Sequence, residues 1–168
     1  MGKAVAHLAK WLGFRVSVSD DRPEFCTPES VPEADEFYPV GLRELALAKP
    51  ILPTTYVILT TRGVTIDVPG LPSLLESEAG YIGIIGSKRR WLTTRKELED
   101  QGIPEEKIRK IQSPIGLELN AETPEEIAVS ILAEIIMLRN STFRLVLRGL
   151  ELRDGPASSF PSSVRLAS

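Results

Sequence analysis

Three short polar segments, each directly after an apolar run, carry the side chains best suited to chemistry in this sequence. Asp20, Asp21 and Arg22 follow the first run, residues 60–63 follow the second, and residues 86–90 follow the third. If the runs are strands of one parallel sheet, their carboxyl ends lie at the same edge, where open α/β sheets bind ligands. We therefore expect the three segments to converge on one crevice.

The first two segments each have a ligand-binding interpretation and a plainer alternative. Asp20 stands where dinucleotide-binding domains keep the acid for the ribose hydroxyls, or it is a turn aspartate before Arg22. Arg62 and Gly63 follow two threonines, and this combination suits an oxyanion or a phosphate. The alternative for them is a solvated loop at the end of a strand.

The third segment gives the sharper signal. Ser87 can cap a helix whose N-terminus attracts anions, and Lys88 with two arginines puts three cations in the first helical turn. These cations oppose the helix dipole, and a bound anion would relieve that repulsion. A basic, solvated turn is the alternative. The cofactor-binding residues that we predict are Asp20, Arg62, Gly63, Gly86, Ser87 and Lys88.

No set of residues for hydrolytic catalysis is evident. The one histidine, His7, lies in a predicted helix without a nucleophile nearby, and Ser87 lacks the Gly-x-Ser-x-Gly context. One cysteine, Cys26, excludes an internal disulfide framework, and one cysteine with one histidine is too few ligands for a structural zinc site. We expect no metal site, no catalytic residues and no catalytic activity of the chain's own.

Composition is that of an ordinary globular protein. The chain has 168 residues, 42% of them apolar and 26% charged, which suffices for one domain with a hydrophobic core. Its net charge of −3 gives no basic field for nucleic acid or an anionic membrane. No apolar run approaches the ~20 residues that cross a bilayer. We expect a cytoplasmic protein that binds neither nucleic acid nor membranes.

Periodicity predicts the elements that would position the polar segments. Continuous apolar runs at residues 14–19, 56–60 and 81–85 are typical of strands covered on both faces. Helical spacing predicts helices over residues 3–13 and 123–140, and the second opens with a capping box. Strands that alternate with helices indicate an α/β fold with a doubly wound, mostly parallel sheet.

The last part of the chain, residues 141–168, differs from the domain predicted over residues 1–140. Leucine and phenylalanine alternate with arginine over residues 143–148, which permits one exposed strand. From Arg153 onward glycine, proline and serine dominate, as in disordered segments. We predict a C-terminal extension that is partly disordered.

Four motifs, in order and with sensible spacing, resemble the C-terminal domain of the XdhC/CoxI family. They are SDDRPEF (residues 19–25), TTRG (60–63), YIGIIGSKRR (81–90) and SPIGLELNAETPEEIAVSILAEI (113–135). The resemblance covers about residues 2–139. Members are accessory proteins for xanthine dehydrogenase and related molybdenum hydroxylases. It implies a Rossmann-like fold, binding of the molybdenum cofactor and delivery of that cofactor to an apo-enzyme.

The chain departs from the family pattern at three places. The family opens this domain with a strand and a GAGHxG-like loop, of which Gly2 matches only the last glycine. The histidine that follows the TRG motif is replaced by Val64, and the N-terminal domain with a Cys-Gly motif is missing. The chain therefore resembles a truncated copy that lacks the first strand of its sheet.

A missing first strand would leave a gap between the strand that ends at Asp20 and the strand that ends at Thr60. Both would then expose unpaired backbone groups along an apolar edge. The gap could be filled by residues 143–147 or another subunit, or closed by direct pairing of the two strands. Arg144 and Arg148 make residues 143–147 a poor central strand, so we expect self-association into a homo-oligomer.

Three functions remain open on the sequence. The first is an accessory or chaperone domain that binds the molybdenum cofactor for a xanthine dehydrogenase-like apo-enzyme. The second is an NAD(P)-binding oxidoreductase or regulatory domain, which the fold and Asp20 favour and the missing glycines disfavour. The third is a scaffold without activity. Fold alone does not choose among them.

Overall fold

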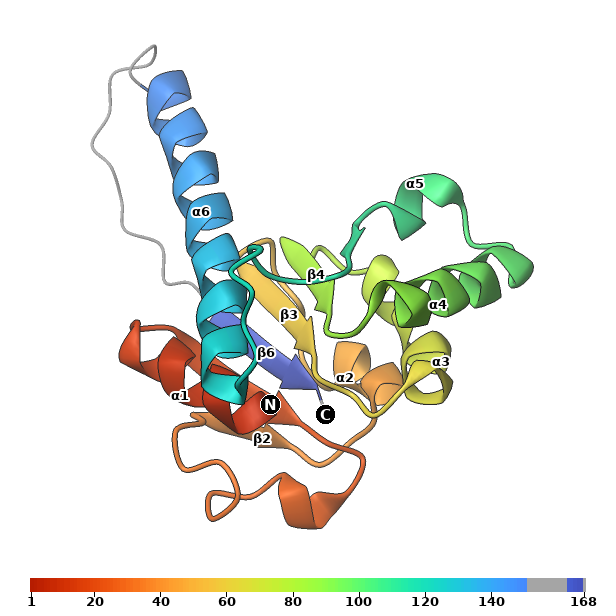
Figure 1. Ribbon diagram of the computed structural model, residues 1–168, viewed down its shortest axis with the longest axis horizontal. Helices are drawn as coiled ribbons and strands as arrows, with labels where there is room; N and C mark the ends of the chain where they lie inside the picture. Colours follow the sequence, from red (N-terminus) through yellow and green to blue (C-terminus); the bar gives the residue numbers. More distant parts are fainter. Residues whose placement is uncertain (151–162, 168) are drawn as a thin grey trace.

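A single sheet of six parallel strands forms the centre of the computed structural model (Figure 1). The structure describes residues 1–150 and 163–167, and for residues 142–150, 163 and 164 it describes the backbone alone. The order across the sheet is β2-β1-β6-β3-β4-β5. The strands are Arg15–Ser19 (β1), Glu36–Tyr38 (β2), Thr55–Leu59 (β3), Tyr81–Ile84 (β4), Ile111–Gln112 (β5) and Ser163–Ala167 (β6).

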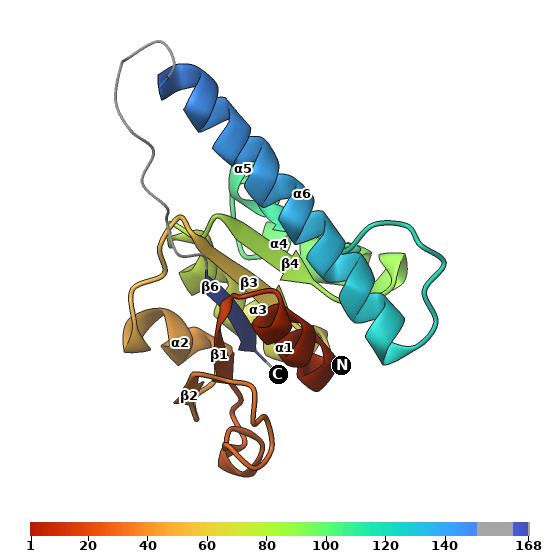
Figure 2. The same cartoon turned by 90° about the vertical axis from the view of Figure 1, so that its left-hand side faces the viewer.

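Helices cover both faces of this sheet (Figures 1 and 2). One face carries α1 (Gly2–Trp11) and α6 (Pro124–Leu150). The other carries α2 (Leu42–Ala48), α3 (Val64–Leu75) and α4 (Lys88–Asp100). A short helix, α5 (Glu105–Ile108), and a 3-10 turn, Pro23–Phe25, lie in the connections. The predicted α/β, doubly wound, Rossmann-like fold class is confirmed.

The apolar runs of the sequence form strands because both of their faces are buried. In β3, Tyr56 and Ile58 pack in the cluster beneath α1 and α6. Their neighbours Val57 and Leu59 pack in the cluster beneath α2, α3 and α4. Alternate residues therefore serve two separate cores, which requires a continuous rather than an alternating apolar pattern. The three predicted strands are confirmed to within a residue or two at their ends.

The gap expected at the centre of the sheet is filled by the chain's own C-terminal residues. Strand β6 pairs in parallel with β1, from Arg15 opposite Ser163 to Ser19 opposite Ala167. It also pairs in parallel with β3, from Thr55 opposite Ser163 to Leu59 opposite Ala167. The prediction of a sheet without its central strand is therefore wrong. The unpaired edges that led us to expect self-association are paired within one chain.

Two further predictions about the last part of the chain are corrected. Helix α6 does not end near Asn140 but continues to Leu150, so residues 143–147 are helical rather than an exposed strand. Residues 163–167 form a strand where disorder was expected, while residues 151–162 lie outside the described part of the chain. Although α6 is 27 residues long, no helix in the described part is both long and apolar enough to cross a membrane.

An arginine side chain is buried at the centre of the sheet. Arg165 of β6 is 3% exposed, and its Nη2 donates to the carbonyl oxygen of Pro50 at 2.9 Å. Its Nη1 lies 3.5 Å from the carbonyl oxygen of Lys49, and its Nε has no partner in the described structure. Burial lowers the pKa of the Arg165 guanidinium. A cation is thus accommodated in a central strand because its long side chain reaches the carbonyl groups that follow α2.

A buried carboxylate fixes the loop between β5 and α6. Glu134 of α6 accepts a hydrogen bond from the Tyr81 hydroxyl at 2.7 Å and another from the backbone N–H of Gly116 at 2.7 Å. Burial and the neighbouring Glu134 raise the pKa of Tyr81. The Ser130 hydroxyl donates to the carbonyl oxygen of Leu117 at 2.5 Å. This loop, which belongs to the longest family-like motif, is therefore tied to α6 by specific polar contacts.

The packing of β6 predicts the effect of shortening Leu166. This side chain is 1% exposed in the core beneath α1 and α6, so Leu166→Ala should lower the free energy of unfolding by about 2–5 kcal/mol. The matched control is Leu47→Ala, since Leu47 is 85% exposed on α2 and its loss should change the free energy by about 0.5 kcal/mol or less. Chemical denaturation measures both. Equal effects would show that β6 is not inserted in the sheet.

The loop before α6 predicts a large effect of Gly116→Ala. Gly116 has φ +96°, and a Cβ there would overlap the Ser130 hydroxyl. Gly102 has φ +77° with nothing near the position of a Cβ, so Gly102→Ala should show the cost of backbone strain alone, about 1–2 kcal/mol. Thermal unfolding of both variants should show a clearly lower melting temperature for Gly116→Ala. A smaller loss at Gly116 than at Gly102 would contradict the tight loop.

Candidate functional site

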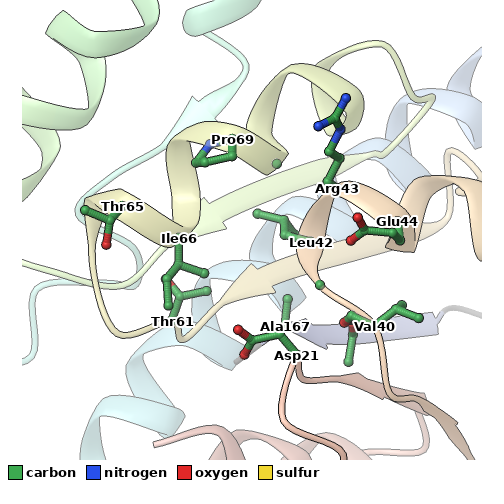
Figure 3. A pocket seen from close by; sticks show the side chains of 13 residues that line it. Asp21, Val40, Leu42, Arg43, Glu44, Thr61, Thr65, Ile66, Pro69 and Ala167 are labelled. Atoms are coloured by element: carbon green, nitrogen blue, oxygen red, sulfur yellow. Dashed lines mark hydrogen bonds between the residues drawn. The ribbon is translucent and has the colours of Figure 1, made fainter.

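A pocket of about 280 Å³ opens at the carboxyl edge of the sheet (Figure 3). It lies over the ends of β1, β6 and β3, and its walls come from the first turns of α2 and α3. Along the chain, β1 leads to β2 on one side of the sheet, whereas β3 leads to β4 on the other. The pocket therefore stands at the topological switch point, where open α/β sheets bind ligands.

Asp20 lies at the end of β1, as predicted, but its carboxylate is occupied. The side chain of Asp20 is nearly fully buried, and Arg22 donates to it through Nε and Nη2, both at 3.0 Å. The backbone N–H of Arg22 donates to the same carboxylate at 3.0 Å. This bidentate pair raises the pKa of the Arg22 guanidinium. The geometry is that of the turn aspartate, and a contact between Asp20 and a cofactor stays a prediction.

Arg62 and Gly63 lie in the loop that connects β3 to α3. The Arg62 Nη2 donates to both carboxylate oxygens of Asp21, at 2.9 and 3.2 Å, and both side chains are about half-exposed. Gly63 precedes the first residue of α3 in an extended conformation that any residue could adopt. The same loop brings Thr61 and Thr65 into the wall of the pocket. Arg62 therefore stands beside the pocket, paired to an acid of its rim.

Gly86, Ser87 and Lys88 lie at the end of β4, and none of them lines the pocket. The predicted cap is confirmed, since the Ser87 hydroxyl accepts a hydrogen bond from the backbone N–H of Arg90 at 3.3 Å. The side chain of Lys88 is exposed. A Cβ on Gly86 would lie 2.8 Å from the Cδ of Arg90. The structure thus brings two of the three strand ends to the pocket and leaves the third outside it.

A buried network at the ends of β3 and β4 was missed from the sequence. Asp67 in the first turn of α3 is 0% exposed and accepts from Arg90 Nη2 at 2.6 Å and from Arg90 Nε at 3.2 Å. Arg90 also donates to the Thr61 hydroxyl at 2.7 Å and to the Thr61 carbonyl oxygen at 3.1 Å. The Thr61 hydroxyl donates in turn to Asp67. One of the three cations that suggested an anion site is therefore neutralised inside the protein.

The sequence did contain a signal for this network. Asp67 is the single charged residue in the otherwise apolar and uncharged stretch of α3, and a lone acid in such a helix indicates a buried partner. What the sequence could not give was the identity of that partner. Arg90 lies 23 residues further along the chain, within a run of three cations.

The described structure shows no arrangement that suggests chemistry of its own at this edge. Within residues 1–150 and 163–167 no group of three or more histidine, cysteine, aspartate and glutamate side chains could hold a metal ion. Cys26 is buried with its thiol 3.4 Å from the carbonyl oxygen of Val18, and burial raises its pKa. His7 lies on α1, away from the pocket, with its Nδ1 2.9 Å from Glu33. The pocket has the features of a binding site.

Comparison with known proteins gives consistent matches. The chain is 34% identical over 135 residues to a probable xanthine dehydrogenase subunit of Bacillus subtilis, which is 80% of this chain and 39% of that protein. It is 29% identical over 85 residues to the molybdenum cofactor insertion chaperone PaoD of Escherichia coli, 51% of this chain and 27% of that protein. A crystal structure described as a xanthine dehydrogenase from Bacillus halodurans superimposes with a TM-score of 0.69 and 35% identity, over 86% of this chain and 42% of that one.

These relatives are longer proteins, of which the chain spans about a quarter to two-fifths. The family described as the XdhC Rossmann domain matches residues 1–135, from the start of α1 into α6. This range contains all four motifs on which the resemblance was based and most of the pocket wall. The chain therefore belongs to the XdhC Rossmann domain family.

Proposed function

We propose that this chain is an accessory domain that binds the molybdenum cofactor and takes part in maturing a xanthine dehydrogenase-like molybdenum hydroxylase. The observation that carries the proposal is the family match over residues 1–135 together with a pocket at the switch point of the sheet. The name of the relative PaoD, a molybdenum cofactor insertion chaperone, supports the same role. The side chains of Asp20, Thr61 and Asp67 at this edge are held by partners within the protein, which suits binding rather than turnover.

The pocket fits one part of such a cofactor. Its volume of about 280 Å³ is near the lower end of small-molecule sites, which are roughly 300–1,000 Å³, so it can take a fused ring. Leu42, Ile66 and Pro69 provide apolar surface for a ring, and Thr61 and Thr65 provide polar atoms (Figure 3). When bound, the cofactor supplies the redox chemistry of the client enzyme. The residues of this chain would bind, orient and shield it.

The predicted strand-end residues take different places in this proposal. Arg62 and Gly63 belong to the loop that carries Thr61 and Thr65, and we propose that they flank the cofactor there. Contacts from Asp20, Gly86, Ser87 and Lys88 stay predictions, and the apo-enzyme of a molybdenum hydroxylase stays the proposed partner.

Filling the pocket should abolish cofactor retention without unfolding the protein. Thr65 lies exposed in the pocket wall, so Thr65→Phe should occupy the space for a ring. Thr93→Phe is the matched control, since Thr93 is exposed on α4 outside the pocket and the helix propensities of threonine and phenylalanine are similar. Protein purified from a cofactor-producing host is assayed for molybdenum, for fluorescence of the oxidised pterin and for thermal stability.

We expect the wild type and Thr93→Phe to retain cofactor and Thr65→Phe to lose at least nine-tenths of it. No molybdenum in the wild type would contradict the proposed function. Equal retention in all three proteins, with unchanged melting temperatures, would place the cofactor elsewhere on the chain.

Dinucleotides should bind weakly. The Asp20 carboxylate, which would accept the ribose hydroxyls, is taken by Arg22, and the small pocket holds at most part of a dinucleotide. We expect a dissociation constant for NADH above ~10⁻⁴ M, or less than about 5.5 kcal/mol of binding free energy, by calorimetry. Micromolar binding that is lost in Asp20→Asn would support the alternative NAD(P)-binding function instead.

A further inference from the structure

The two buried hydroxyls in the wall of the pocket have no proton left to donate. Ser19 is 2% exposed, and its hydroxyl donates to the carbonyl oxygen of Val40 at 2.6 Å. Thr61 is 5% exposed, and its hydroxyl donates to Asp67 while it accepts from Arg90. A hydroxyl carries one proton and two lone pairs, so each can still accept a hydrogen bond from a ligand but cannot give one.

Two carboxylates at the same pocket add to this acceptor character. Arg62 takes one lone pair on each oxygen of Asp21, and a carboxylate has about four such positions, so Asp21 can still accept. Glu44 has no hydrogen bond or ion pair from its side chain within the described part of the chain, and its Oε2 folds back over Gly41, 3.0 Å from where a Cβ would stand. Glu44 is thus an acceptor without a donor.

The positive ends of the neighbouring helices already face acids of this chain. The first turns of α2 and α3 border the pocket and contain Glu44 and Asp67 respectively. These carboxylates meet the preference of the helix dipoles for negative charge. The single cation of the lining is Arg43, whose side chain extends away from Asp21 and Ala167 (Figure 3). An anionic ligand would therefore enter a pocket whose side chains offer it acids rather than free cations.

We propose that the pocket recognises the N–H donor edge of a pterin-type ring, its 2-amino group and the adjacent ring N–H, and not the phosphate. Glu44 and Asp21 accept from this edge, because a carboxylate pairs with two parallel N–H groups. Thr61 and Ser19 accept at the floor, while Leu42 and Ile66 contact the ring faces. The inference rests on the proposed function and deepens it, since it states which part of the cofactor this domain holds.

The test compares two free heterocycles that differ at this edge. Pterin carries the 2-amino group, and lumazine carries a carbonyl oxygen in its place, which would face the carboxylates with a lone pair. Titrations followed by ligand fluorescence, with equilibrium dialysis as a check, should give at least tenfold weaker binding of lumazine, or about 1.4 kcal/mol. Inorganic phosphate at millimolar concentration should not displace pterin, and Thr65→Phe should abolish pterin binding.

Variants connect the preference to the two acids. Glu44→Gln and Asp21→Asn should each weaken pterin binding at least fivefold and bring pterin and lumazine closer together. Glu76→Gln is the matched control, because Glu76 is an exposed acid at the far end of α3 that pairs with Lys107, and it should leave both affinities unchanged. Melting temperatures are measured beside each titration.

The outcomes separate this inference from the proposed function. Equal affinity for pterin and lumazine, or displacement of pterin by phosphate, would overturn the donor-edge inference even if the wild type retains molybdenum cofactor. A clear preference for pterin that both acid variants lose would support it, even if protein from the cofactor-producing host contains no molybdenum. Loss of the preference in Glu76→Gln as well would show a general effect of charge and would also overturn it.

Discussion

Backbone hydrogen bonds to β6 hold the two halves of this protein together. Strands β1 and β3 are buried on both faces, and neither could leave one side of its backbone unpaired in such surroundings without a large cost. Strand β6 pairs with each of them over five residues, in the same direction and register. It also contributes Leu166 to one core and Ala167 to the other. The helices on each face, and the meeting of β1 and β3 at one pocket, depend on this strand.

The pocket follows from that pairing. Ala167 ends β6 in the pocket floor, and its carbonyl oxygen accepts from the backbone N–H of Thr60 at 2.9 Å, where the β3–α3 loop begins. The Thr61–Asp67–Arg90 network then fixes the same loop from the other side. Both Thr61 and Ser19 spend their protons on the protein. The tertiary contacts that build the pocket therefore also set its polarity, which is that of an acceptor surface.

Buried ionic groups occur at several of these key positions, and each has a local partner. Arg90 meets Asp67, Arg22 meets Asp20, and Arg165 reaches the carbonyl groups after α2. Buried charge is tolerated only when such hydrogen bonds compensate for lost solvation. Two of these arginines lie in the segments that resembled an anion site. A run of cations at strand ends is thus a poor guide to a ligand when acids a few residues away, or one helix away, can bind them first.

The sequence by itself determined the fold class, the three main strands, the capped start of α6 and the family, because these depend on local periodicity and on contiguous motifs. It also placed polar residues at the carboxyl edge. It did not determine what fills the centre of the sheet, because residues 163–167 pair with strands more than 100 residues away and contain an arginine, which local rules disfavour in a central strand. Nor did it separate ligand contacts from internal ion pairs. Asp67 and Arg90 come together only when α3 and α4 pack on one face, and the free acceptors of Ser19, Thr61 and Glu44 are known only once every other hydrogen bond has a partner.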